Sequence, residues 1–178
     1  MVRPQIGRVC QEHDWVKAHV VCGVKTNVIT AVEIHDKNAN DSSFLPSLLE
    51  STVKNFTVRE LSADKQYASV ANLDAIAKHG VTPFIPFKTN VNGKAGGAFG
   101  KAYHYFNLYR EEFLASYHKR SNIESTFMIV KAKFGDSVRS KTDVAMKNEV
   151  LCKILCHNIC CLISAMYELG VDPKLMAV

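Results

Sequence analysis

The sequence predicts a mixed α/β fold, and three observations support this. Residues 15–24 and 28–35 alternate with a period of two and are rich in β-branched side chains, which is typical of two strands joined by a short turn. Shorter apolar runs then alternate with helical segments. Two long stretches with helical signals, over about 109–134 and about 141–169, follow. The predicted order is β-β-α-β-α-β-loop-α-α.

The segments between the predicted hairpin and the long helices carry boundary signals of their own. Asp41 or Ser42 can cap a helix, Ser69 can cap a second one, and Gly80 ends that second helix. Residues 88–100 contain four of the nine glycines and predict a flexible loop. The expected elements are a helix over about 43–55, a strand over 57–63, a helix over about 70–79 and a strand over 81–87.

The composition is that of one globular domain. The chain has 178 residues, of which 47% are hydrophobic and 22% are charged, and its net charge is +5. Residues 51–150 hold the basic surplus, with 15 basic and 9 acidic side chains. This surplus permits an anionic partner such as nucleic acid, although a solvated helix face is an equally simple explanation.

No membrane-spanning segment is expected. The most apolar stretch, residues 151–166, is shorter than the ~20 residues that a spanning helix needs, and it contains Lys153, His157 and Asn158. Residues 1–13 have no apolar run, so no secretory signal is visible. We therefore expect a cytoplasmic protein whose six cysteines are reduced.

We expect the cysteines and the tryptophan of this sequence to have structural roles rather than to bind metal. We expect the cysteines of the last helix to pack in the core, because buried cysteine behaves as a small apolar side chain. Zinc binding is disfavoured for His19 and Cys22, because two positions that differ by three face opposite sides of a strand. Trp15 is expected to anchor the core or a sheet edge. The cysteines concerned are Cys152, Cys156, Cys160 and Cys161.

A polar stripe lies beside the apolar face of the first long predicted helix. At about 100° per residue, Tyr117, Arg120, Glu124 and Lys131 share a sector of about 60°. A half-sheltered carboxylate can bind Mg²⁺, and Arg or Lys beside it can bind phosphates. The simpler alternative is an ordinary i,i+4 ion pair between Arg120 and Glu124.

A second carboxylate, Asp64, follows a predicted strand, where functional groups of α/β sheets commonly lie. A turn or capping role is the alternative for it. Together, a strand-end Asp and a helical Glu in a basic setting suggest metal-assisted phosphodiester chemistry. Further candidates for contact with DNA are Lys17, His19, Lys119 and Lys133.

These motifs resemble those of a known family. Tyr117-x2-Arg120-x3-Glu124-x6-Lys131 matches the Y-(2)-R-(3)-E-(6)-K signature of transposases of the insertion-sequence 4 superfamily. The segment Ala-Asp-Lys-Gln-Tyr-Ala-Ser at 63–69 is similar to their second-aspartate motif. The resemblance covers roughly residues 8–170, with further similar segments at 14–19, 85–88 and 147–151.

The resemblance implies a ribonuclease H-like mixed sheet flanked by helices. It also implies DNA transposition through an Asp-Asp-Glu triad and two Mg²⁺ or Mn²⁺ ions. Asp64 would be the second acidic ligand and Glu124 the third, while Tyr117, Arg120 and Lys131 would position DNA phosphates. The implied partners are double-stranded DNA, as transposon ends and target, and further copies of the chain in a homo-oligomer.

The sequence departs from the family at the first aspartate. Residues 1–13 contain no Asp, and neither Asp14, Asp36 nor Asp41 fits the first position of the triad. We therefore expect a transposase domain that is truncated at its N-terminus and lacks the first, central strand. The expected boundaries are an extension over 1–13, a partial catalytic domain over 14–170 and a tail over 171–178. An inactive remnant that only binds DNA or associates with a full-length transposase is the alternative.

Overall fold

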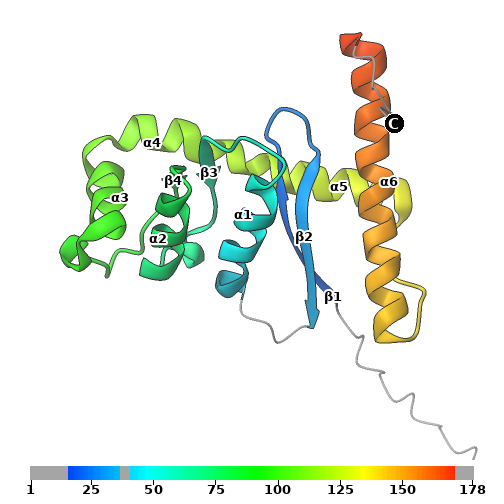
Figure 1. Cartoon of the computed structure of the whole chain (residues 1–178), viewed down its shortest axis with the longest axis horizontal. Coiled ribbons are helices and arrows are strands. Elements are labelled where there is room, and N and C mark those ends of the chain that lie inside the picture. Colours follow the sequence, from blue (N-terminus) through cyan, green and yellow to red (C-terminus); the bar gives the residue numbers. More distant parts are fainter. Residues whose placement is uncertain (1–15, 37–40, 171–178) are drawn as a thin grey trace, which may run out of the picture.

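The computed structural model describes residues 16–36 and 41–170 and is a mixed α/β structure (Figure 1). Helices α2, α3 and α4 lie at one end, the hairpin of β1 and β2 lies in the middle, and α6 lies at the other end. The expectations for Trp15, Asp14, the extension over 1–13 and the tail over 171–178 fall outside the described residues.

The predicted hairpin is confirmed. Strand β1, Val16–Cys22, pairs antiparallel with β2, Ile29–Asp36, and His19 lies opposite Glu33. The turn between them closes with a hydrogen bond of 2.9 Å from the N–H of Gly23 to the carbonyl of Val28. The period-two pattern of the sequence therefore identified these two strands correctly.

The other two strands form a separate small sheet. Strand β3, Glu60–Ser62, runs parallel to β4, Thr82–Phe84, and helix α2, Val70–Lys78, connects them. The cap of α2 is as predicted, because the Ser69 hydroxyl accepts the N–H of Asn72 at 3.2 Å. Among the described residues the strands thus form two two-stranded sheets, β1-β2 and β3-β4.

Helix α1, Leu45–Val53, packs against both the β1-β2 hairpin and α2. It follows a short 3-10 turn, Asp41–Phe44, and it has a proline in its first turn, where a missing N–H costs no hydrogen bond. Phe44 precedes α1, and no side-chain cap bonds its first turn. The apolar side of α1, with Leu45 and Leu49 buried, packs into the main core.

The first long helix is not continuous, which corrects the prediction over 109–134. The chain forms α4, Arg110–Tyr117, then a 3-10 turn η4, His118–Ser121, then α5, Asn122–Phe134. Figure 1 shows α4 and α5 crossing the molecule from α3 towards α6. The break occurs because α4 packs against the β3-β4 unit, whereas α5 packs against the hairpin and α6.

The glycine-rich segment is only partly a loop. Residues 93–95 form a 3-10 turn, and α3, Gly97–Leu108, begins inside the predicted loop. Gly96 and Gly97 both have positive φ, which allows the chain to enter the helix without the strain that a side chain would cause. Phe99 and Phe106 then anchor α3 in the core.

The last helix, α6, Asp143–Leu169, matches the prediction over 141–169, and Gly170 ends it in the left-handed conformation. The predicted burial of its cysteines is wrong for Cys152 and Cys156, which are exposed, while Cys160 and Cys161 are half-buried. Only Ile154 and His157 of α6 are buried. Helix α6 therefore has the expected apolar side chains, but the rest of the described chain does not pack over most of them.

By length and composition, α6 could also cross a membrane, because an 18-residue window within it has a mean hydropathy of 1.7. Helix α6 is therefore longer than residues 151–166, the apolar stretch that we judged too short to span a membrane. One such helix is weak evidence, since core helices of soluble proteins pass the same test. Only 11% of that window is buried, and the contacts of α6 are with the hairpin and α5.

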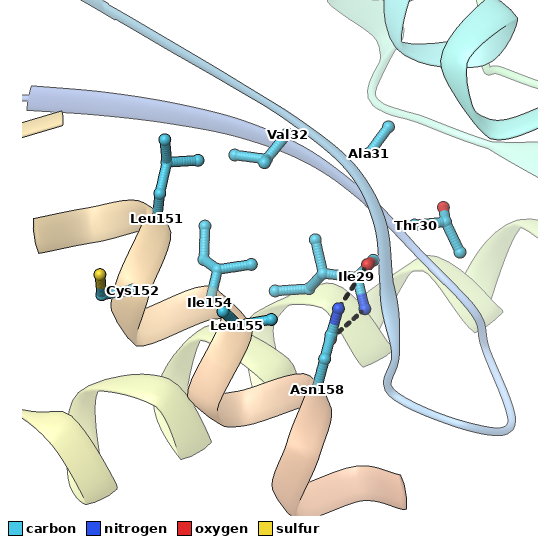
Figure 2. A pocket seen from close by; sticks show the side chains of 9 residues that line it. All are labelled: Ile29, Thr30, Ala31, Val32, Leu151, Cys152, Ile154, Leu155 and Asn158. Atoms are coloured by element: carbon cyan, nitrogen blue, oxygen red, sulfur yellow. Dashed lines mark hydrogen bonds between the residues drawn. The ribbon is translucent and has the colours of Figure 1, made fainter. Parts of the chain in front are cut away.

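Hydrogen bonds connect α6 to the hairpin. The Asn158 side chain accepts the N–H of Ile29 and donates to the carbonyl of Ile29, both at 2.8 Å (Figure 2). The His157 imidazole bonds the carbonyl of Asn27 at 2.9 Å. Beside these bonds lies an open, mostly apolar pocket of about 350 Å³ between β2 and α6, with Leu151 and Leu155 on its helix side.

Two hydrophobic clusters hold the described residues together. The larger one joins α1, α2, α3, α4 and the β3-β4 sheet, and Phe113 is fully buried within it. The smaller one contains Ile29, Val130 and Ile154, which join β2, α5 and α6. The polar groups described next lie between these two clusters, at the junction of α4 and α5.

Candidate active site

Asp64 lies two residues after the end of β3, as the sequence predicts. Its backbone is extended, and its carbonyl accepts the N–H of Tyr67 at 2.9 Å at the start of a 3-10 turn. The Asp64 side chain is 47% exposed, so its carboxylate can be approached from solvent. The strand therefore fixes the main chain, while the side chain remains accessible to solvent.

The end of α4 is fastened to the same strand. The Ser62 hydroxyl donates to the carbonyl of Ser116 at 3.1 Å, and the Lys119 ammonium bonds Glu60 at 3.1 Å. Lys119 thus pairs with the start of β3, although its side chain is still 46% exposed. These contacts hold the η4 turn against β3 and place the residues of that turn beside Asp64.

Tyr117, the last residue of α4, connects the core to this junction. Its ring lies parallel to that of Phe113, with 6.5 Å between the ring centroids. Its hydroxyl oxygen accepts the N–H of Arg120 Nε at 2.9 Å, and the hydroxyl lies 3.5 Å from Asp64 Oδ1. The tyrosine therefore reaches from a fully buried neighbour to a solvent-accessible carboxylate.

Arg120 contacts both predicted carboxylates. Its Nε lies 3.3 Å from Asp64 Oδ1, and one terminal nitrogen lies 3.3 Å from Glu124 Oε1. The Arg120 side chain is 28% exposed, whereas that of Glu124 is 66% exposed. Two carboxylates that are 60 positions apart in the sequence therefore share one guanidinium. We call Asp64, Tyr117, Arg120 and Glu124 the carboxylate cluster.

The electrostatics of the carboxylate cluster favour the charged guanidinium. Burial alone would lower the pKa of Arg120. The hydrogen bond to Tyr117 and the negative charges of Asp64 and Glu124 outweigh that effect and raise this pKa above its usual value. Arg120 therefore stays positively charged throughout the physiological pH range.

The other candidate residues lie farther from the carboxylate cluster. Lys131 is exposed near the end of α5, seven residues from Glu124 and thus about 10 Å along the helix axis. Lys133 is exposed in the same turn, on the way to α6. Lys17 and His19 lie on β1 in the hairpin, and the His19 ring is 5.0 Å from that of Phe44.

A comparison with protein-family models places this arrangement in context. Residues 3–159 match the model described as "Transposase DDE domain". The chain belongs to the transposase DDE domain family. No curated protein and no solved structure matches the chain. The family model covers both β3 with Asp64 and α5 with Glu124, so the whole carboxylate cluster lies within the matched DDE domain.

The family implies a divalent metal ion, and the DDE domain offers a partial set of ligands for one. In residues 16–36 and 41–170, no three His, Cys, Asp or Glu side chains gather into a metal-binding group. Asp64 and Glu124 both contact one cation, however, the Arg120 guanidinium. Mg²⁺ commonly binds through one or two carboxylates, with water and substrate phosphates completing its octahedron, so these are the two side chains that would hold it.

Some residues that shape the site were not singled out by the sequence. Phe113 supports Tyr117 from four positions earlier, on the same face of α4, and this i,i+4 aromatic pair was visible as a spacing. The contacts of Ser62 and Glu60 with the end of α4 join segments more than 50 positions apart. No local pattern signals contacts of that kind.

Proposed function

We propose that this DDE domain is the catalytic domain of a transposase of the insertion-sequence 4 superfamily, with a ribonuclease H-like sheet. It would cut phosphodiester bonds at insertion-sequence ends and transfer the resulting 3′-hydroxyl to target DNA. The observation that carries the proposal is the meeting of Asp64 and Glu124 at one cation, within a match to the transposase DDE domain.

In this proposal each side chain has one task. Asp64 and Glu124 bind divalent cations, Mg²⁺ or Mn²⁺. When bound, such cations activate water and stabilise the attacking and leaving oxygens of an in-line displacement. Arg120 binds a DNA phosphate through its planar fork, and Tyr117 holds that guanidinium in orientation. Lys131 binds a neighbouring phosphate as a point charge.

The first carboxylate of the triad is the open part of the proposal. We propose that it lies on a central strand between the hairpin and β3, preceding the partial domain over 14–170. The two separate sheets β1-β2 and β3-β4 support this arrangement, because one strand between them would make a single mixed sheet. Activity would then require that strand together with Asp64 and Glu124.

The test is nicking of supercoiled plasmid DNA in Mn²⁺, with the chain as it stands and with the chain joined to an upstream strand that carries an aspartate. We expect nicking from the extended protein, loss of nicking to background in Glu124→Gln, and retention in Glu168→Gln. Glu168 is a matched control because it is exposed on α6, away from the carboxylate cluster. Undiminished nicking by Glu124→Gln would refute the catalytic assignment.

A second candidate function is DNA binding without cleavage. It is supported by the observation that only two acidic side chains meet at the carboxylate cluster within the described residues. In this case the basic surface of η4 and α5 contacts DNA phosphates. The logarithm of the binding constant then falls linearly with log[salt]. Replacing Lys119, Lys131 or Lys133 by Gln would each lower the salt slope by about one. Mn²⁺-dependent nicking by the 178-residue chain alone would contradict this alternative.

We also propose that the protein is a homo-oligomer and that α6 supplies the contact. Leu155 and Ile163 are 60% and 46% exposed on this helix, and the sector that contains them carries no charge. An uncharged apolar stripe of this kind marks an interaction surface. Pairing with the same stripe of a second copy satisfies two-fold symmetry, because one patch then serves both partners. A cytoplasmic location with DNA as the other partner agrees with this arrangement.

A further inference from the structure

Arg120 contacts both carboxylates of the proposed metal site. Its Nε and one terminal nitrogen lie 3.3 Å from Asp64 and from Glu124, respectively. The guanidinium is also held from the side, since Nε donates to the Tyr117 hydroxyl at 2.9 Å and the guanidinium carbon lies 5.5 Å from the Tyr117 ring centroid. We propose that Arg120 is a built-in cation that keeps divalent metal out of the carboxylate cluster until a DNA phosphate draws it away.

Charge makes the two occupants mutually exclusive. The guanidinium neutralises one of the two negative charges and uses oxygens that a metal ion would need. A divalent cation placed on the same oxygens would stand within a few ångströms of a fixed positive charge, and repulsion between such charges is strong at a partly dehydrated site. Asp64 and Glu124 can therefore bind either Arg120 or the metal through these oxygens.

A phosphate is the ligand best able to release Arg120. Guanidinium groups bind phosphate oxygens in a bidentate fork, and this pairing competes directly with single contacts to carboxylates. Arg120 makes one contact of 3.3 Å to each carboxylate. The contact with Asp64 is an ion pair, because the single Nε–H is donated to Tyr117, and the hydrogen bond to Glu124 is long for a charged pair. A DNA phosphate approaching the exposed side of the carboxylate cluster can thus take the guanidinium and leave the carboxylates open.

The consequence is a coupling between the two ligands. DNA raises the affinity for divalent metal, and by thermodynamic reciprocity metal raises the affinity for DNA by the same factor. Part of any such coupling arises because a phosphate can bind the metal directly. The contribution of Arg120 can be measured without DNA, because removing the guanidinium should by itself raise the affinity of the protein for divalent metal.

The experiment measures Mn²⁺ binding to the full chain by electron paramagnetic resonance of the free ion. It uses wild type, Arg120→Gln and Arg110→Gln, each with and without a 20-base-pair duplex. Arg110→Gln is the matched control, because it makes the same substitution at an exposed position at the start of α4, where Arg110 lies over the Phe106 ring and contacts neither carboxylate. Arg120→Lys, which keeps the charge but lacks the fork, is the second variant. Circular dichroism verifies that all variants are folded.

We expect Arg120→Gln to bind Mn²⁺ about tenfold more tightly than wild type without DNA, and to show a smaller gain when the duplex is added. Arg120→Lys should fall between the two, and Arg110→Gln should change the affinity by less than about twofold. Unchanged or weaker binding by Arg120→Gln would overturn this proposal alone, as would an equal rise in Arg110→Gln. This inference rests on the proposed metal site, so no Mn²⁺ binding by any variant would overturn both.

Discussion

Replacing Phe113 by leucine should destabilise the fold more than its apolar character alone suggests. Phe113 has no exposed surface, and leucine would keep most of that burial. What the substitution removes is a set of ring contacts, each worth about 0.5–1.5 kcal/mol beyond buried area. The ring centroids around Phe113 are those of Phe106 at 4.9 Å, Phe84 at 5.4 Å, Tyr105 at 6.1 Å and Tyr117 at 6.5 Å.

The four contacts are not additive, because they share one ring and the neighbours can relax. A full truncation of a buried Phe to Ala costs about 3–5 kcal/mol, which sets the upper limit. We therefore expect Phe113→Leu to lower the free energy of unfolding by about 2 kcal/mol. Since Phe113 also supports Tyr117, the loss should be felt at the carboxylate cluster as well as in the core.

Urea unfolding followed by circular dichroism at 222 nm measures this difference, with the slope m verifying that the unfolded state is unchanged. Phe56→Leu is the matched control, because Phe56 is 46% exposed and the same substitution there should cost less than about 0.5 kcal/mol. Equal losses in the two variants, or a loss below 0.5 kcal/mol in Phe113→Leu, would refute the reasoning from ring contacts.

Three further outcomes are expected. Asn158→Ala should lower the free energy of unfolding by about 1–3 kcal/mol in the same assay, because it removes two 2.8 Å hydrogen bonds and leaves main-chain groups of β2 unpaired; an unchanged midpoint would contradict this. Hydrogen bonds from Ser140 lower the pKa of Glu149 from 4.5 to about 2, so its contribution to stability is present above about pH 4.5 and is lost as the pH falls to 2; thermal midpoints between pH 2 and 6 should fall less steeply in Glu149→Gln than in wild type. Leu155→Glu should convert a dimer to a monomer in light scattering after gel filtration, whereas Val70→Glu, at a 46% exposed position on α2, should not.

Local patterns were sufficient to predict several elements. Alternation identified the hairpin, and Ser69 with Gly80 marked both ends of α2. The break of the long helix at 118–121 could not be predicted in the same way. Those four residues include neither Pro nor Gly, and the break results from two packing partners that lie on different sides of the molecule.

The carboxylate cluster, too, could be predicted only in part from local patterns. Angular spacing grouped Tyr117, Arg120 and Glu124, and in the structure Arg120 does contact both Tyr117 and Glu124 despite the break between α4 and α5. Lys131 shared the sector but lies too far along α5 to join them. The contact with Asp64 depends on how β3 meets the end of α4, which a helical wheel does not describe.

The exposed cysteines of α6 illustrate a different limit. A run of apolar residues shows that a helix can be buried, but it does not show whether the same chain provides the cover. Here Ile154 and His157 are buried against the hairpin, while Cys152 and Cys156 are exposed. The prediction that this part of α6 is apolar is correct, whereas the prediction that Cys152 and Cys156 are buried is wrong.

The bond between Asn158 and Ile29 also has a consequence for the order in which the protein is made. The amide group of Asn158 bonds both main-chain groups of Ile29, as a peptide group of a neighbouring strand would. It therefore closes one position on the edge of β2 against a foreign strand. Because Asn158 follows Ile29 by 129 positions, a ribosome exposes the hairpin long before it completes α6. Until then, this edge of the nascent chain is open to pairing with any extended segment nearby.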